Sequence, residues 1–202
     1  MSPNKILLST RNLHKRLELE EILADLDVQI LTLDEAGIDL VVEEDGNTFA
    51  ENALKKAITI ARVSDYVTLG DDSGLAVDAL NGAPGIYSAR FAGEHATDRD
   101  NNFKLLQMLE NIPEPLRTAR FVCTIAVCTP QGKSSVVEGT CEGRIGFTPR
   151  GEGGFGYDPL FIPVGYDQSF AELGGNIKNK ISHRGKALNQ ARKVIENLFG
   201  IR

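Results

Sequence analysis

The sequence predicts an α/β fold built on a mixed β-sheet, and three observations carry this prediction. Short apolar runs alternate with segments of helical periodicity in the first half of the chain. Two β-rich runs joined by a turn fill the middle, and a long amphipathic helix lies near the end. This combination is typical of helices packed on a sheet. At 202 residues, the chain is expected to form a single domain, residues 1–202, or one compact unit with two lobes.

The opening of the chain predicts a strand, a polar turn and a helix. Residues 5–9 are a short apolar run and residues 10–12 are a polar break. From about residue 14 to residue 26, leucine and isoleucine follow helical spacing. A second helix is expected to start at Thr48, because Thr48 to Glu51 has the pattern of a capping box.

A strand over residues 66–70 is expected to run into Asp71-Asp72-Ser73-Gly74 and to turn sharply at Gly74. Another capping-box pattern at Thr97 opens a predicted helix that continues to about residue 109. The remaining predicted segments are β-rich runs over 119–129 and 134–140, the turn 130–133, a glycine-rich stretch over 143–156 and a helix over 182–199.

Composition limits the classes of partner. The chain is 42% hydrophobic and 25% charged, as expected for a globular fold with a sizeable core, and its formal net charge is -6. An acidic surface repels a polyanion, so DNA and RNA are not expected partners. No run is long enough for a signal-peptide core or a membrane span, so a cytoplasmic protein without membrane partners is expected. Cys123 and Cys128 lie in apolar runs, where buried reduced thiols are expected.

The polar break after the first strand is a candidate phosphate site. Free amides at a helix start attract anions, Thr10 and Asn12 supply short polar groups, and Lys15 supplies a positive charge. An ordinary helix cap with a solvated lysine explains the same residues, because caps use these residue types routinely. Taken alone, this segment leaves both interpretations open.

Asp71 and Asp72 are the candidate metal site. We expect the pair at the carboxyl end of a strand, where open α/β sheets bind ligands. Adjacent carboxylates repel one another unless a cation or a proton intervenes, and oxygen ligands of this kind suit Mg²⁺. The alternative is a turn capped by an aspartate. Glu43-Glu44-Asp45-Gly46 is more often a solvated loop.

Residues 151–159 match the dinucleotide pattern GxGxxG only formally. Pro159 follows at once and no helix opens, so this interpretation is rejected in favour of a loop that presents aromatic side chains. Phe155 or Tyr157 could stack on a purine. His183 and Arg184 begin the last predicted helix, where they could bind a carbonyl oxygen or an anion, and where a capping histidine is equally expected.

Together these motifs closely resemble the inosine/xanthosine triphosphate pyrophosphatase family over nearly the whole chain. The matching segments are Thr10-x-Asn12-x-x-Lys15, Thr48-Phe49-x-Glu51-Asn52-Ala53, Asp71-Asp72-Ser73-Gly74-Leu75, Gly82-Ala83-Pro84-Gly85-Ile86-Tyr87-Ser88-Ala89-Arg90, Gly153-Gly154-Phe155-Gly156-Tyr157-Asp158-Pro159 and Ser182-His183-Arg184-Gly185.

The resemblance implies an elongated mixed sheet flanked by helices, two lobes with a central active-site cleft, and a homodimer. It also implies Mg²⁺-dependent hydrolysis of aberrant purine nucleoside triphosphates to a monophosphate and pyrophosphate. Lys15 and Asp72 would be catalytic, and Glu44 and Asp72 would bind Mg²⁺. The implied substrate-binding residues are Thr10, Arg11, Asn12, Leu13, His14 and Lys15 for the phosphates, Ser73, and Phe155, Gly156, Tyr157, Asp158, Lys178, His183 and Arg184 for the base.

The chain departs from the family pattern at three positions. Arg11 and His14 stand where many members have glycine, and Tyr157 replaces the tryptophan of some relatives. Two other functions fit part of the pattern. One is a pyrophosphatase of the septum-inhibitor type that acts on modified pyrimidines. The other is a catalytically silent nucleotide-binding module, which would not need Glu44 and Asp72.

Overall fold

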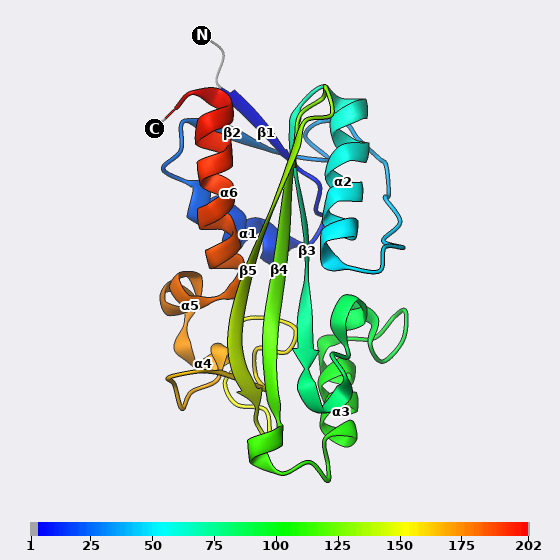
Figure 1. Cartoon of the computed structure of the whole chain (residues 1–202), viewed down its shortest axis with the longest axis vertical. Coiled ribbons are helices and arrows are strands. Elements are labelled where there is room, and N and C mark those ends of the chain that lie inside the picture. The colour runs from blue at the N-terminus through cyan, green and yellow to red at the C-terminus, as the bar shows by residue number, and fades with distance from the viewer. Residues whose placement is uncertain (1–3, 202) are drawn as a thin grey trace. The chain divides into compact units, whose positions relative to one another are not determined.

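A computed structural model describes residues 4–201 of the chain (Figure 1). The strands are β1 (Asn4–Leu8), β2 (Val28–Thr32), β3 (Val67–Val77), β4 (Thr118–Cys128), β5 (Ser134–Ile145) and β6 (Phe161–Pro163). The α-helices are α1 (Leu13–Leu23), α2 (Phe49–Ser64), α3 (Asp98–Met108), α4 (Phe170–Leu173), α5 (Gly175–Ile181) and α6 (His183–Phe199). Short 3-10 helices cover Asp78–Leu80, Gly85–Arg90 and Glu114–Leu116.

The strands form one six-stranded sheet in the order β2-β1-β3-β4-β5-β6. β1 pairs in parallel with β2 and with β3, whereas β5 and β6 are antiparallel. The predicted α/β class with a mixed sheet flanked by helices is therefore confirmed. Among residues 4–201, no helix has both the length and the apolar character needed to cross a bilayer.

The described chain divides into two compact units. Unit 1 contains residues 4–72, 123–139 and 184–201, and unit 2 contains residues 73–122 and 140–183. β3, β4 and β5 each contribute residues to both units. That residues 1–202 act as a single catalytic domain stays a prediction, and residues 1–3 and 202 lie outside the described residues.

Local sequence signals explain where most helices start. Thr97 caps α3 with a complete capping box, in which Thr97 and Asp100 each accept a backbone hydrogen bond, as predicted. Thr48 accepts a bond from the Glu51 amide, but the Glu51 carboxylate accepts from the Asn47 amide, so the expected reciprocal bond shifts by one residue. α1 ends at Leu23 instead of continuing to residue 26.

The largest difference from the sequence-based expectation concerns the two adjacent acids. β3 does not stop at residue 70 and turn at Gly74, because it continues through Asp71 and Asp72 as far as Val77. Its parallel pairing with β1 ends at Leu8 and Leu69, just before the acids. The acids therefore lie in mid-strand, beyond the carboxyl end of the neighbouring strand.

In unit 1, helices cover both faces of the sheet: α1 and α6 lie on one face and α2 on the other (Figure 1). Alternation along the strands explains this arrangement, because successive side chains point to opposite faces. Thus Ile6 and Leu8 pack with α1 and α6, whereas Leu7 packs with Ile60 of α2. Cys123 and Cys128 are buried free thiols, as predicted.

The core of unit 2 is richer in aromatic residues. Phe121 and Phe161 pack with ring centroids 4.7 Å apart, and Phe170 joins them. Tyr157 and the aliphatic residues of β3 and α3 complete this cluster. The short elements β6, α4 and α5 lie around it and were missed by the sequence analysis.

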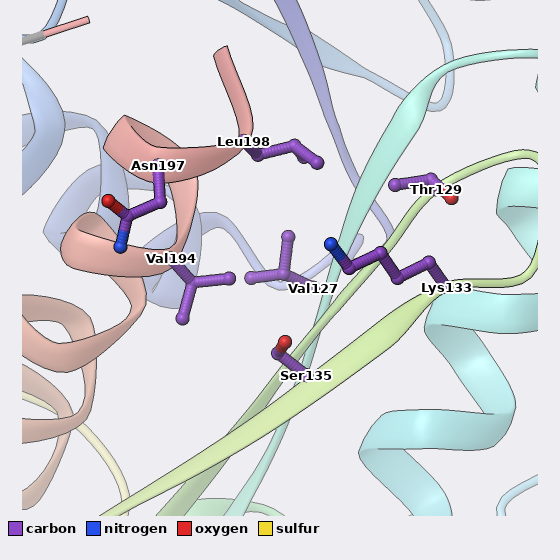
Figure 2. Close-up of a pocket in the computed structure, with 7 residues that line it drawn as sticks. All are labelled: Val127, Thr129, Lys133, Ser135, Val194, Asn197 and Leu198. Carbon is purple, nitrogen blue, oxygen red and sulfur yellow. The ribbon is translucent and has the colours of Figure 1, made fainter. Parts of the chain in front are cut away.

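A small hollow of about 200 Å³ lies in unit 1 between the start of β5 and the end of α6 (Figure 2). Val127, Val194 and Leu198 form its apolar part, and Lys133 extends over it. None of the predicted site residues lines this hollow.

Candidate active site

The predicted phosphate turn is a well-formed helix cap. Thr10 Oγ1 accepts a hydrogen bond from the Asn12 amide at 3.2 Å, and Asn12 Oδ1 accepts one from the Lys15 amide at 3.1 Å. The capping interpretation is thus observed, and the phosphate interpretation stays a prediction. The Asn12 cap places Lys15 in the first turn of α1.

Arg11, one of the departures from the family pattern, is anchored outside this turn. Its guanidinium donates to Asp34 and to the Ile38 carbonyl, both at 3.1 Å, and to Asp39 at 3.3 Å. Leu13 and His14 are exposed. The unusual side chains of this segment therefore do not fill the turn between Thr10 and Lys15.

Asp71, which the sequence pairs with Asp72 as a candidate metal site but to which the family resemblance gives no role, is the centre of a buried charge cluster. Lys15 Nζ lies 2.5 Å from Asp71 Oδ1, and Arg184 Nε lies 3.3 Å from Asp71 Oδ2. Cys123 Sγ also donates to Asp71 Oδ2, at 3.0 Å. Arg184 forms a second ion pair with Glu18 of α1. We call Lys15, Glu18, Asp71 and Arg184 the charge cluster.

Opposite charge, not solvent, keeps Asp71 ionised. Burial alone would raise the pKa of Asp71, which is only 2% exposed. Lys15 and Arg184 outweigh burial and hold the pKa of this carboxyl well below its usual range. The pKa of Cys123 moves far above its usual value, because the thiol is buried and faces the negative charge of Asp71. Cys123 is therefore a neutral packing residue.

Asp72 has the opposite electrostatic environment. Burial raises the pKa of this carboxyl, which is 5% exposed, and the negative charge of Glu44 raises it further. Lys56 and Lys15 act against this rise without cancelling it. Asn52 Nδ2 donates to Asp72 Oδ2 at 3.0 Å and fixes the orientation of the carboxyl group. A raised pKa suits a group that has to accept a proton.

Helix α2 holds the loop of residues 43–46, which contains Glu44, close to Asp71. Lys56 Nζ contacts Glu44 Oε1 at 2.8 Å and the Asp71 carbonyl at 2.6 Å. Asn52 Oδ1 also accepts a bond from the Gly46 amide at 2.8 Å. Glu44 is thus held to α2 by an ion pair, although it lies in a loop and its side chain is 35% exposed. Its role as a metal ligand stays a prediction.

The close approach of β3 to α2 depends on Gly70. A Cβ atom at this position would lie 2.3 Å from the carbonyl oxygen of Ala53, which is impossible without moving the backbone.

Asn52 and Lys56, which contact the acids, were not among the residues predicted from the sequence. The available signal was two polar residues four positions apart on the buried face of an alanine-rich helix.

The predicted base-binding residues of unit 2 other than His183 lie in, or contact, the segment from Gly153 to Asp158, which we call the aromatic loop. Lys178 Nζ forms a buried ion pair with Asp158 Oδ2 at 2.7 Å and lies 4.6 Å from the centre of the Phe155 ring. Asp158 Oδ2 also accepts a bond from the Phe155 amide at 2.9 Å. Phe155 is half-buried, so its ring is partly accessible.

Of the other predicted substrate contacts, Tyr157 and His183 are more buried. Tyr157 is 4% exposed, its ring belongs to the core of unit 2, and its hydroxyl donates to the Ser88 carbonyl at 2.9 Å. Burial raises its pKa, and the negative charge of Asp98 adds to the rise. His183 stacks on Phe121 with centroids 4.6 Å apart, and Ser73 is half-buried. Phe155 is therefore the aromatic residue better placed for stacking.

Comparison with known proteins identifies the family. The Ham1 family model matches residues 6–194. The dITP/XTP pyrophosphatase of Desulforamulus reducens is 52% identical over 96% of this chain and 97% of its own length. The protein of the same name from Clostridium perfringens is 50% identical over 98% of each chain. A HAM1 protein structure from Coxiella burnetii is 40% identical, with a TM-score of 0.88 over 96% of this chain and 99% of that one. The resemblance in the sequence is thus confirmed, and the chain belongs to the Ham1 family.

Proposed function

We propose that the protein hydrolyses inosine, deoxyinosine and xanthosine triphosphates to the nucleoside monophosphate and pyrophosphate. One observation carries this proposal: two adjacent buried acids have opposite electrostatic environments. The negative charge of Asp71 is balanced by Lys15 and Arg184, whereas Asp72 faces Glu44 and has a raised pKa. The names of relatives that are about half identical in sequence support the same activity. Such an enzyme would remove aberrant purines before they enter DNA or RNA.

The residues at Asp72 fit a magnesium ion. Glu44 and Asp72 are hard oxygen ligands, and the charge of one raises the pKa of the other, a repulsion that a divalent cation relieves. Within residues 4–201, no cluster of three or more His, Cys, Asp and Glu side chains could hold a metal, so substrate oxygens would complete the ligand set. When bound, Mg²⁺ would neutralise phosphate charge and lower the pKa of a bound water.

Asp72 would accept a proton in the hydrolytic step. The oxygen of water attacks the α-phosphorus, the bond from that phosphorus to the bridging oxygen breaks, and pyrophosphate leaves with the bonding electrons. The proton of the attacking water passes to Asp72, which Asn52 holds in a fixed orientation. Lys15 would stabilise the phosphate oxygens, because Asp71 keeps its ammonium group in place.

Selectivity would depend on the 6-position of the purine. Inosine and xanthosine carry a carbonyl oxygen there, and adenosine carries an amino group. Donors such as Lys178 and Arg184 would pair with the carbonyl but would leave an amino group unpaired, which costs about 1–3 kcal/mol for each buried group. In this structure Lys178 lies beside Phe155 in unit 2, and Arg184 belongs to the charge cluster in unit 1.

Assembly and location belong to the same proposal. We propose a homodimer in the cytoplasm, where nucleotide pools are maintained. Buried free thiols at Cys123, Cys128 and Cys141 fit a reducing compartment.

The test is to incubate the purified protein with inosine triphosphate and Mg²⁺, and with adenosine and guanosine triphosphates in parallel, and to identify the phosphate product. Pyrophosphate from inosine triphosphate, with little from adenosine triphosphate, is the expected result. Orthophosphate would mean that a different bond is cleaved. Binding without release would favour a silent nucleotide-binding module, and preference for modified pyrimidines would favour the septum-inhibitor type.

A further inference from the structure

Helix α3 holds the aromatic loop at a single residue. Asp98 Oδ2 accepts a hydrogen bond from the Gly156 amide at 2.6 Å, and Asn102 Nδ2 donates one to the Gly156 carbonyl at 2.9 Å. Asp98 and Asn102 are four residues apart, so both side chains project from one face of the helix. Both backbone polar groups of Gly156 are therefore bound by α3.

The backbone conformation of Gly156 fits this double contact. Its φ of 62° lies in the left-handed region, which glycine adopts without strain. In this conformation the residue presents its amide and its carbonyl to the same helix. The neighbouring residue, Phe155, is fixed from elsewhere, because its amide donates to Asp158.

Apolar packing does not replace these two bonds. The space between α3 and the loop is a hollow of about 550 Å³, and Phe103, which lines it, is 63% exposed. The hollow is lined by Asp98, Arg99, Asn102, Phe103, Leu106, Pro149, Glu152, Gly153, Gly154, Phe155, Gly156 and Pro159. A loop that borders a hollow has few side-chain contacts on that side, so its position there depends on its hydrogen bonds.

We propose that Asp98 and Asn102 are positioning residues for base recognition. By holding Gly156 they set the path of the aromatic loop, and hence the position of the Phe155 ring on which the purine stacks. This inference rests on the proposed function and extends it to two residues of α3 that do not touch the substrate. Phe155 would contact the base, whereas Asp98 and Asn102 would hold the loop that positions Phe155.

Four variants test the proposal by steady-state kinetics with inosine and adenosine triphosphates. Asp98→Ala removes the acceptor and Asn102→Asp removes the donor at nearly constant shape. Asp98→Asn keeps an acceptor oxygen and serves as the conservative rescue. Phe103→Ala changes the same hollow without touching Gly156 and is the matched control.

The expected result is a rise in KM for inosine triphosphate of about tenfold in Asp98→Ala and Asn102→Asp, which corresponds to losing one hydrogen bond to a charged or buried group. The kcat value should change little, because base stacking contributes to ground-state and transition-state binding alike. The preference for inosine over adenosine triphosphate should fall. Asp98→Asn and Phe103→Ala should behave like the parent.

A fluorescence measurement separates loop position from turnover. The sequence contains no tryptophan, so Phe155→Trp provides a single reporter on the loop. Inosine monophosphate should quench it by stacking, and adding Asp98→Ala should raise the Kd about tenfold over the reporter alone. Equal Kd values, or a drop in kcat at constant KM, would overturn the positioning role. If the parent hydrolyses no purine triphosphate at all, the proposed function itself fails, and the fluorescence titration still tests the loop.

Discussion

The two units hold their predicted site residues in different ways. In unit 1, Lys15 and Arg184 are fixed by ion pairs to the buried Asp71. In unit 2, the aromatic loop is fixed by hydrogen bonds to its backbone and borders a hollow. The two units thus fix side chains in two ways, by ion pairs to a buried carboxylate in unit 1 and by hydrogen bonds to the loop backbone in unit 2.

The ion pairs to Asp71 in unit 1 are stable only as long as every partner is present. A buried charge is costly unless it is paired, and removing one partner leaves the others uncompensated. Asp71 has two cationic partners and a thiol donor, so it links α1, β4 and α6 through one carboxylate. The aromatic loop involves no comparable set of charges on its α3 side.

The largest effect is expected at Asp72. Asp72→Asn should lower kcat by about 100- to 10,000-fold at saturating Mg²⁺, because the amide cannot accept the proton. Thermal unfolding should show no loss of stability, because the fold already disfavours the charged form of this carboxyl. Near-normal turnover of the variant would contradict the assignment of catalysis to unit 1.

The charge cluster should dominate stability. Asp71→Asn removes the anion shared by the buried Arg184 and the partly buried Lys15 and should lower the free energy of unfolding by about 3–5 kcal/mol. Urea unfolding measures this change. The matched control is Asp25→Asn, which breaks an ion pair with Arg192 at an aspartate that is 67% exposed, and it should have no measurable effect. Similar losses in both variants would remove the distinction between the cluster and a surface pair.

The carboxyl groups of Asp71 and Asp72 should have very different pKa values. Carboxyl ¹³C NMR without metal should show Asp72 protonating above the ordinary aspartate pKa of about 3.9, and Asp71 still ionised well below it. These pKa shifts make the folding stability depend on pH. The stability that ionised Asp71 contributes is lost as pH falls through its low folded-state pKa. Protonation of Asp72 removes the destabilising effect of its buried negative charge as pH falls through its raised folded-state pKa. Coincident titrations would show that the two carboxyls share one environment.

A smaller effect is expected where the aromatic loop enters the core. Tyr157→Phe removes the hydrogen bond to the Ser88 carbonyl and should lower the free energy of unfolding by about 1 kcal/mol. Turnover of inosine triphosphate should be unchanged, because this ring is buried in the core of unit 2. A large rise in KM would instead assign Tyr157 a direct contact with the base.

The fold was predictable where the signal is local. Capping residues and helical spacing located α3 and α6 closely, and the turn over 130–133 located the junction of β4 and β5. β2 was missed, because a short edge strand with mixed burial has no alternating pattern to detect. β3 was cut short in the prediction, because two acids followed by Ser73-Gly74 are also the signature of a turn.

The family resemblance indicated Lys15, Glu44 and Asp72 as site residues, and their roles stay predictions. The structure places each of them close to other charged groups. Asp98 and Asn102 carry no such signal, because their contact with Gly156 joins positions more than fifty residues apart in the chain. Helical spacing explains why they share a face but cannot show what that face meets.

The position of Lys56 has a consequence for the proposed metal site. The ammonium of Lys56 touches both the Glu44 carboxylate and the backbone of Asp71, so a cation from the chain itself stands beside the acids. If Glu44 and Asp72 bind a metal as proposed, the loop that carries Glu44 is already held to helix α2 before the ion arrives.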